Sequence, residues 1–553
     1  MHSLADALVF LLVATSLGQA FGNANVEQEE PLPRRSGEAF QCDVDRESRA
    51  TIALKALEIL KMNDFTVVKP GIFAGHRPSN GEQVGGNPNT LYMLAAFNDT
   101  DRLLTPPDYP PAEWPFDPSS DNGPSPPPGP VSDQLMGVSI QRGEAIVLLF
   151  CTPPPAKYFG LTSYVTNRVL FNDTGGGRGD ASLVVHMPLA EISNPLNYLV
   201  MNTTKGTATA ARKVDPSSFF NSLSLAVFSP SREVYQTITE AFVQAGLAER
   251  ASNFYPLSAQ TIRLHDRSKP FEWNYPDRLS VLCRVSYFED KAAADAWASH
   301  PWPAFFIKAP DLPHYQRSVP EQRLLSDISG ESEQTYLPTI HSLLAAIIAN
   351  KTASGHARLL RQEQIVAVPN DRGTRNQCLN NNSFIAAVDP LMMAGGCGFG
   401  TTDCRYGTSA ALDQPFGLDK FFIVVGVQHE RLGHSSYSSI MLTSQLGYEE
   451  INHTITIRET DGREAPALYL SEHDYPDLNV LYSVTFARTC PQDERFCKEF
   501  SEAQFRGEDI IYWMERAYLQ QSTGVSPNID EYLYFKTRRA RKELLESYKR
   551  LSE

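Results

Sequence analysis

The chain has 553 residues, 42% of them hydrophobic, which is too long for one ordinary core and predicts two or three packed domains. Its formal net charge of -15 at pH 7 argues against nucleic acid or an anionic membrane as the main partner, because affinity for phosphates depends on clustered Lys and Arg. Beyond the amino terminus no apolar run approaches the roughly twenty residues of a transmembrane helix, so we expect no membrane span.

The amino terminus has the pattern of a secretory signal peptide. The apolar run from Leu8 to Leu17 is too short to cross a bilayer as a helix, and the small residues after it suit a cleavage site. We therefore predict a signal peptide over residues 1–20, a flexible leader over 21–38 and a secreted or extracellular protein, with the secretory-pathway lumen as the alternative. The leader contains Arg35, and the sequence leaves open whether the chain is processed there.

Eight cysteines lie beyond the signal peptide, and an even number in an oxidising compartment favours disulfides. Two short spacings predict local pairs, Cys397 with Cys404 and Cys490 with Cys497. Neither pair has the spacing of a structural zinc site, so we predict no metal and no cofactor. Four further cysteines pair among themselves or stay free: Cys42, Cys151, Cys283 and Cys378.

Six Asn-x-Ser/Thr sequons are spread over the mature chain, which fits a glycoprotein of the secretory pathway better than a cytosolic protein. Chance occurrence in Asn-rich loops is the alternative. Glycosylation is predicted at Asn98, Asn172, Asn202, Asn350, Asn381 and Asn452.

The first domain is expected over residues 39–330. Apolar residues near the helical period predict a helix from Arg46 to Met62. Strands are predicted at Leu91–Phe97 and Glu144–Phe150, with a proline-rich insertion over 105–131 between them. Such an insertion is compatible with strand pairing, because a longer surface loop adds little closure entropy.

The rest of this domain has the order β-α-β-β-α-β. This order predicts a ferredoxin-like split unit, an antiparallel sheet with two helices on one face, within an α+β fold. The first helix has an N-cap and a first-turn proline in Ser229-Pro230, and the second has Asp290 as its cap. The predicted elements are a strand at Leu223–Val227, a helix that ends at Gly246, strands at Thr261–Leu264 and Leu279–Phe288, a helix at Lys291–Ser299 and a strand at Ala304–Ala309.

A second, sheet-rich α+β domain is expected over residues 331–530. Short β-branched and aromatic runs separated by polar turns are typical of strands. The basic tail 531–553 has apolar residues at helical spacing, which favours an amphipathic helix, although Arg538 to Arg541 also matches a convertase site and leaves processing at Arg541 open. The predicted elements are helices at Ile340–Asn350 and Glu508–Gln520, and strands at Phe421–Gln428, Tyr437–Thr443, His453–Arg458, Ala467–Leu470 and Val480–Arg488.

The segment from His429 to His434 contains the residue types of a zinc-protease helix, but its two histidines are five positions apart instead of four. On a helix such positions lie about 140° apart around the axis, so they do not share a face. Loop histidines can still meet at a site, and His473 with Asp474 offers another histidine–carboxylate pair. These four residues are the catalytic candidates, and surface loop histidines are the alternative interpretation.

A second candidate site lies on a polar, aromatic segment. Tyr158, Tyr164, Asn167 and Arg168 could line a pocket that hydrogen-bonds an anionic or hydroxylated ligand. The alternative is a half-buried strand whose tyrosine hydroxyls reach solvent, with Arg168 at its end. Arg178-Gly179-Asp180 matches an adhesion tripeptide, a match that chance often produces in a long chain.

Three segments resemble a family of exported, uncharacterised proteins. They are Cys151 to Gly160, with the sequence CTPPPAKYFG, the strand–helix pair from Leu223 to Gly246, and Phe421 to Met441, which begins FFIVVGVQH. No activity is assigned to that family, so the resemblance implies export and carries over no functional residue.

The sequence supports two functions of different class. The first is a secreted or lumenal, disulfide-stabilised glycoprotein that binds a small molecule or another extracellular component. The second is an extracellular hydrolase or lyase that uses His429, His434 or His473 with a neighbouring carboxylate. A pair of these histidines within hydrogen-bond reach of a carboxylate would favour the enzyme.

Overall fold

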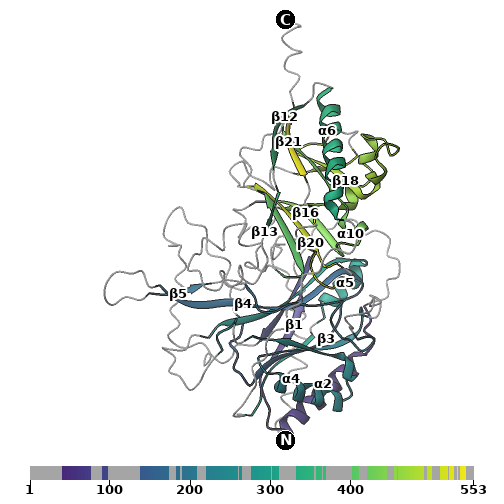
Figure 1. Cartoon of the computed structure of the whole chain (residues 1–553). Coiled ribbons are helices and arrows are strands. Elements are labelled where there is room, and N and C mark those ends of the chain that lie inside the picture. Colours follow the sequence, from purple (N-terminus) through teal and green to yellow (C-terminus); the bar gives the residue numbers. More distant parts are fainter. Residues whose placement is uncertain are drawn as a thin grey trace. The chain divides into compact units, whose positions relative to one another are not determined.

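The computed structural model divides the chain into two compact units (Figure 1). Unit 1 comprises Met1–Gly81 and Asn89–Gln322, and unit 2 comprises Glu82–Pro88 and Arg323–Glu553. The predicted signal peptide, leader, proline-rich insertion and Arg178-Gly179-Asp180 tripeptide lie outside the described residues. The structure describes residues 40–75, 90–97, 137–172, 182–186, 190–207, 219–258, 261–264, 276–300, 302–310, 332–353, 357–363, 365–368, 401–409, 420–444, 454–457, 459–490, 495–500, 511–520, 522–527, 532–533 and 536–542.

Unit 1 contains an 11-stranded sheet with the order β5-β4-β10-β2-β1-β11-β3-β8-β9, in which β6 and β7 also pair with β4. Neighbouring strands are antiparallel except β8 and β9, which are parallel. The strands are β1 (Thr66–Gly75), β2 (Thr90–Phe97), β3 (Glu144–Cys151), β4 (Ala156–Asn172), β5 (Ser182–His186), β6 (Ala190–Glu191), β7 (Leu196–Asn197), β8 (Leu223–Ser229), β9 (Ser252–Pro256), β10 (Arg278–Phe288) and β11 (Trp302–Lys308).

Two helices, α2 (Arg46–Met62) and α4 (Arg232–Gln244), lie side by side against this sheet (Figure 1). Their apolar faces pack with alternate residues of β3, β8 and β11, such as Leu149 and Leu225, to form the main core of the unit. The bounds of α2 agree with the prediction. The cap of α4 is Ser231 instead of Ser229, because the Ser231 side chain accepts the hydrogen bond from the first-turn amide of Val234.

The α+β class is confirmed, whereas the ferredoxin-like unit is not. The predicted order of elements occurs as β8, α4, β9, β10, α5 (Lys291–Ala298) and β11. However, β2 and β1 lie between β10 and β11, so these strands belong to one large sheet and do not pair as a separate unit. The predicted strand at Thr261–Leu264 is absent from those described residues, and β9 lies earlier in the chain.

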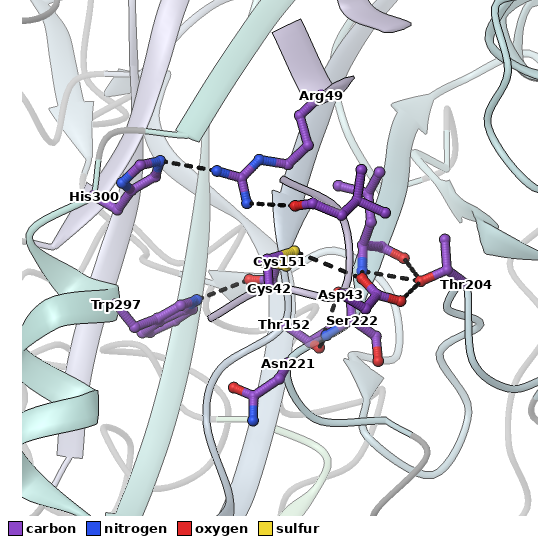
Figure 2. Close-up of a disulfide and its surroundings, with 12 residues drawn as sticks. Cys42, Asp43, Arg49, Cys151, Thr152, Thr204, Asn221, Ser222, Trp297 and His300 are labelled. Atoms are coloured by element: carbon purple, nitrogen blue, oxygen red, sulfur yellow. Dashed lines mark hydrogen bonds between the residues drawn. A yellow bond between two sulfur atoms is a disulfide. The ribbon is translucent and has the colours of Figure 1, made fainter. Parts of the chain in front are cut away.

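A disulfide between Cys42 and Cys151 joins the segment before α2 to the end of β3, with 6.0 Å between the Cα atoms (Figure 2). The indole nitrogen of Trp297 donates a hydrogen bond to the Cys151 carbonyl at 2.8 Å. Asp43 accepts one from the Leu223 amide at 2.8 Å. The disulfide therefore connects the amino-terminal segment to β3 in a region where β8 and α5 also make contacts.

Unit 2 contains two five-stranded sheets, named here the β15 sheet and the β20 sheet. The β15 sheet has the order β12-β21-β15-β18-β19, and the β20 sheet has the order β13-β14-β20-β16-β17. Their elements are α6 (Leu337–Ala353), β12 (Ala357–Glu363), β13 (Ile365–Val368), β14 (Cys404–Ser409), β15 (Lys420–Val427), α10 (His429–Leu432), β16 (Tyr437–Ser444), β17 (Thr454–Ile457), β18 (Leu481–Ala487), β19 (Cys497–Glu499), β20 (Ile511–Tyr518) and β21 (Lys536–Lys542).

The β15 sheet is the middle layer of this unit. One face packs against α6 through residues such as Leu343 and Ile423. On the other side, Trp513 of β20 makes edge contacts with Phe422 and Phe486, at ring-centroid distances of 5.3 Å and 4.9 Å. Each sheet therefore contributes one buried face to the space between them.

Two predicted elements of unit 2 are wrong, and one strand of the unit was not predicted. The segment Glu508–Gln520, predicted as a helix, contains the strand β20, which pairs with β14 and β16 on its two sides. Residues 536–542 of the basic tail form the strand β21, which lies between β12 and β15, whereas Leu544, Tyr548 and Leu551, on which the predicted helix depends, lie outside the described residues. The convertase-like Arg538–Arg541 segment is therefore held inside a sheet. In place of the predicted strand at Ala467–Leu470, the chain has a short 3-10 helix at Pro466–Leu468 followed by a turn.

The second described disulfide joins Cys490 and Cys497, as predicted, with 5.7 Å between their Cα atoms. The predicted Cys397–Cys404 bridge is wrong, because the buried Cys404 takes part in no disulfide. Cys397 and Cys378 lie outside the described residues. None of the described helices combines the length and apolar character that a bilayer crossing needs.

A candidate acid–base site in unit 2

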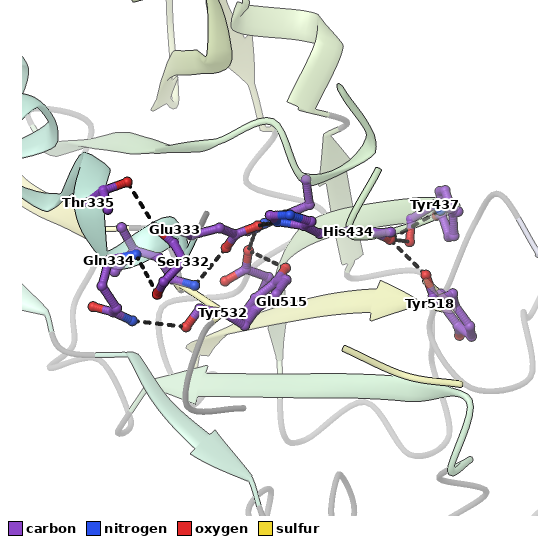
Figure 3. A network of polar contacts seen from close by, with 12 residues as sticks. Ser332, Glu333, Gln334, Thr335, His434, Tyr437, Glu515, Tyr518 and Tyr532 are labelled. Carbon is purple, nitrogen blue, oxygen red and sulfur yellow. Dashed lines mark hydrogen bonds and ion pairs between the residues drawn. The ribbon is translucent and has the colours of Figure 1, made fainter. Parts of the chain in front are cut away.

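The candidate site lies where the chain passes between the two sheets of unit 2. After β15 ends, α10 and the following turn carry His429 and His434 before β16 begins in the β20 sheet. Glu515 lies on β20, and Tyr532 lies between β20 and β21, where the chain returns to the β15 sheet. Glu333 begins a 3-10 turn directly before α6. Segments remote in sequence therefore bring these five side chains together. Figure 3 shows Glu333, His434, Glu515 and Tyr532 of this group.

The Glu333 carboxylate is the centre of this network. Its Oε1 atom lies 2.8 Å from Nδ1 of His429 and 2.7 Å from Nδ1 of His434. Its Oε2 atom accepts a hydrogen bond from the Leu533 backbone amide at 2.7 Å. The Glu333 side chain is completely buried, so these contacts replace the water that an exposed carboxylate would have.

A second carboxylate lies on the other side of His429. Glu515 Oε1 is 3.1 Å from His429 Nε2 and accepts a hydrogen bond from the Tyr532 hydroxyl at 3.1 Å. The Tyr532 ring stacks on the His429 imidazole with 3.9 Å between ring centroids. His429 is thus held at both nitrogens and on one ring face.

The contacts fix the ionisation of Glu333. Burial by itself would raise the pKa of this carboxyl, but the charge of His429 and the hydrogen bonds from His429, His434 and Leu533 outweigh it and lower the pKa from 4.5 to about 2. An ionised carboxylate only accepts hydrogen bonds, so both histidines carry a proton at Nδ1. The Nε2 atom of His434 has no hydrogen-bond partner among the described residues, and 4% of that side chain is exposed.

A glycine explains how both histidines reach one oxygen. The helix α10 has only four residues, and Gly433 after it has φ of 75° in the left-handed region. The His434 amide then donates to the His429 carbonyl at 2.9 Å. The expectation that the two side chains diverge by about 140° is therefore wrong, because it assumed a helix that continues through His434.

Within the described part of the chain, the side chains of this network do not form a cluster of three close metal-ligand atoms. Among the described residues, one group of three places its ligand atoms within 4.8 Å of one another, and it consists of Cys42, Asp43 and Cys151. Those two cysteines are already joined in a disulfide. The imidazoles of His429 and His434 instead contact Glu333 as hydrogen-bond donors.

The remaining catalytic candidates lie outside the network. His473 and Asp474 are exposed on a turn between short 3-10 helices. Three members of the network, Glu333, Glu515 and Tyr532, were not predicted from the sequence. Glu515 had a usable signal, since it shares one strand face with the apolar residues Trp513 and Ala517, but that segment was predicted as a helix.

The four residues of the candidate ligand site on β4 are buried, and Arg168 and Tyr164 have hydrogen-bond partners within the protein. Arg168 donates to both carboxylate oxygens of Asp277, at 2.9 Å and 2.6 Å, and to the Thr261 carbonyl. Tyr164 is hydrogen-bonded to Arg284, and burial raises the pKa of its hydroxyl well above the usual value. Tyr158 and Asn167 are also buried. These contacts belong to a polar network inside unit 1, and ligand binding at these residues stays a prediction.

The predicted glycosylation sites differ in their surroundings. Asn350 is exposed in the last turn of α6. Asn202 is half-buried, and its side-chain amide donates to the Ser252 carbonyl at 3.4 Å. Asn172 is the last residue of β4. The other three sequon asparagines, Asn98, Asn381 and Asn452, lie outside the described residues.

Comparisons with known proteins give distant structural neighbours. No protein-family model and no curated protein matches the chain. An uncharacterised protein of Burkholderia cenocepacia is similar over 97% of this chain and 96% of its own, with 12% identity and a TM-score of 0.35. A protein of Vibrio parahaemolyticus is similar over 89% of this chain and 98% of its own, with 9% identity and a TM-score of 0.31.

Proposed function

We propose that this protein is an exported glycoprotein whose unit 2 carries out acid–base chemistry on a small molecule, as a hydrolase or lyase with His434 as general base. The observation that supports this is the 2.7 Å contact between His434 Nδ1 and the ionised Glu333. Such a contact holds an imidazole in the tautomer whose Nε2 accepts a proton, which is the arrangement a general base needs.

The adjacent serines favour direct base catalysis over a covalent mechanism. The Ser435 hydroxyl donates to the carbonyls of Tyr437 and Tyr518, at 2.6 Å and 2.8 Å, and the Ser436 hydroxyl donates to the Tyr518 carbonyl at 3.4 Å. Their hydroxyls are therefore turned toward backbone oxygens. His434 would instead take a proton from water, for hydrolysis, or from a carbon acid, for elimination.

Export is part of the same proposal. It is supported by the signal-peptide pattern, the resemblance to exported proteins, and the disulfides Cys42–Cys151 and Cys490–Cys497, which persist in oxidising compartments. Mass analysis of protein from the native cell should find an amino terminus after residue 20, oxidised cysteines and attached glycans. An intact amino terminus with reduced thiols and no carbohydrate would contradict export.

The test of His434 uses a substitution that keeps its hydrogen bond. In His434→Asn the amide nitrogen takes the position of Nδ1 and can still donate to Glu333, while the base is removed. The full chain is assayed on p-nitrophenyl acetate, p-nitrophenyl phosphate and p-nitrophenyl β-glucoside, with His473→Asn as the control for an exposed histidine of the same unit. Hydrolysis that is lost in His434→Asn and kept in His473→Asn supports the proposal. No hydrolysis by the wild type, or equal rates in both variants, overturns the hydrolase.

A binding protein without catalysis is the second candidate, and the burial of the network favours it. His429 and Glu333 are completely buried, and His434 is 3% exposed. In that case the network only stabilises the place where the chain passes from the β15 sheet to the β20 sheet, which we call the corner between the sheets. His434→Asn would then lower thermal stability slightly and change no rate.

A further inference from the structure

We propose that unit 1 has a binding site for a small carboxylate anion at the buried guanidinium of Arg49, beside His300 and Trp302. The observation that supports this site is a surplus of N–H donors around a buried positive charge. The site is independent of the acid–base chemistry proposed for unit 2, because all three residues belong to unit 1.

The three side chains come from two parts of unit 1 that are remote in sequence. Arg49 lies near the start of α2, His300 follows α5, and Trp302 begins β11. The guanidinium carbon of Arg49 lies over the Trp302 ring, 4.8 Å from its centroid, and the His300 ring centroid is 4.4 Å from the Trp302 ring centroid. Figure 2 shows the guanidinium between His300 and the segment that precedes α2. The Trp302 ring therefore packs against both nitrogen-bearing groups.

Arg49 is a buried charge that forms no ion pair with a carboxylate of the described ranges. Its residue is 8% exposed, and burial lowers the pKa of the guanidinium. One terminal nitrogen donates to the Val44 carbonyl at 3.3 Å, and the other lies 3.3 Å from Nε2 of His300. A guanidinium has five N–H donors, so these two contacts leave three of them. Arginine is rarely buried to this extent unless an anion is paired with it.

The two carboxylates whose charge acts on Arg49 are held by other groups. Asp45 accepts hydrogen bonds from the amide and the hydroxyl of Ser48, at 2.9 Å and 2.6 Å. Asp43 accepts a hydrogen bond from the Leu223 amide at 2.8 Å. Their negative charges repel any further anion, and they repel a doubly charged phosphate more than a singly charged carboxylate.

The neighbours of the guanidinium add donors and not acceptors. A guanidinium can only donate, so Nε2 of His300 accepts from it and the imidazole proton is on Nδ1. Burial and the charge of Arg49 lower the pKa of His300 from 6.5 to about 4, so the ring is neutral at pH 7. The indole nitrogen of Trp302 is buried and makes no hydrogen bond to the residues that the structure describes. Since most buried polar groups are paired, this set of donors indicates that an acceptor belongs here.

A carboxylate matches this set of donors. Its two oxygens can accept from neighbouring N–H groups of one guanidinium, which is the paired geometry that arginine forms with carboxylates. His300 is partly exposed, so a small anion can approach the cluster from solvent. The site is thus suited to the carboxylate end of a small organic acid.

Anion titration of the full chain at pH 7 tests the site. The probe is sodium acetate, compared with sodium phosphate and sodium chloride at equal ionic strength. The readout is the NMR resonance of the Trp302 indole N–H, assigned by its loss in Trp302→Phe. Acetate should move this resonance with a dissociation constant of roughly 1–10 mM, which is compatible with a ligand of four non-hydrogen atoms, and phosphate should bind more weakly. A response to acetate that does not saturate, an equal response to chloride, or tighter binding of phosphate would overturn the proposal.

Substitutions of Arg49 locate the binding. Arg49→Gln should weaken acetate binding about tenfold or more, because it removes the charge and most of the donors, and Arg49→Lys should weaken it less. The matched control is Arg232→Gln, because Arg232 is an exposed arginine of α4 whose guanidinium carbon lies 5.7 Å from the centroid of the Phe254 ring. This variant should bind acetate as the wild type does. Equal affinity of Arg49→Gln and Arg232→Gln would overturn the site, and the wild-type titration can still refute it if Arg49→Gln does not fold.

Discussion

Replacement of Glu333 by Gln should destabilise unit 2 by about 3 kcal/mol at pH 7. The pKa of this carboxyl falls from 4.5 to about 2 in the folded protein, and each tenfold change in acid strength corresponds to about 1.4 kcal/mol. The amide also places a donor beside imidazole and backbone N–H groups that need an acceptor. Breaking one side of a buried charged network costs about 3–5 kcal/mol in other proteins, which agrees in size.

The pH dependence has a defined direction. Because the folded pKa is depressed, the contribution of Glu333 is complete above pH 4.5 and is lost as the pH falls toward 2. Wild-type stability should therefore decline over this range more steeply than that of Glu333→Gln. Urea unfolding of both proteins at pH 7, 5 and 3 measures the difference, which should be largest at pH 7 and smallest at pH 3.

The control is Glu464→Gln, in the same unit. Glu464 forms an ion pair with Arg495 at 2.8 Å, but its side chain is 51% exposed. Water screens such a pair, so its loss should change stability by less than about 1 kcal/mol. If Glu333→Gln were as mild as Glu464→Gln at pH 7, or if the difference from wild type did not shrink on acidification, the ionised buried carboxylate would be refuted.

Three further predictions concern single features of the fold. Gly433→Ala should lower the free energy of unfolding in urea by about 1 kcal/mol. The cause is the backbone φ of 75° alone, because an added Cβ meets nothing within 4 Å. An unchanged free energy of unfolding would contradict the left-handed turn. The Cys42–Cys151 bridge spans 109 positions and the Cys490–Cys497 bridge spans 7. Removal of the first should lower the free energy of unfolding by about 2 kcal/mol more than removal of the second, because it closes the longer loop. Equal losses would contradict loop-closure entropy as the cause. Glycopeptide mass spectrometry should find Asn350 occupied and Asn202 empty, and the reverse occupancy would contradict their relative exposure.

Local signals in the sequence predicted several elements well. The helix α2 has the predicted bounds, and Asp290 caps α5 by accepting from the amides of Ala292 and Ala293. Such caps join residues two or three positions apart, so they are visible in the chain itself. The Cys490–Cys497 bridge is predictable for the same reason.

Elements that depend on distant neighbours were predicted poorly. The strand β21 in the basic tail was not predicted, because its backbone is used in ladders with a partner strand on each side, β12 and β15. The same applies to β20, whose two partners, β14 and β16, lie more than sixty residues earlier in the chain. Tertiary pairing overrides a weak local preference in both cases.

The candidate site contains both a part that the sequence predicts and a part that it does not. His429 and His434 were recognisable as a pair, because their residue types and short spacing are local. Their common partner, Glu333, is 96 positions from His429, and nothing in its neighbourhood marks it as a buried carboxylate. A single αL residue, Gly433, decided whether the histidines diverged or met, and its conformation follows from where α10 ends.

The network is either a clamp, meaning a purely structural network that stabilises the corner, or a site that transfers protons. The choice between the two depends on Nε2 of His434, which makes no hydrogen bond to the described residues. Glu333, His429 and Glu515 would stabilise the corner in either case, so their substitution alone cannot separate the two. Nε2 of His434 is not needed for the hydrogen bond to Glu333, which uses Nδ1. A clamp would therefore tolerate Asn at this position with a loss of about 1 kcal/mol at most, whereas a general base would lose its reaction while the fold persists. A stability loss in His434→Asn as large as that in Glu333→Gln would mean that the ring itself supports the corner, and His434 would then be a structural residue instead of a base.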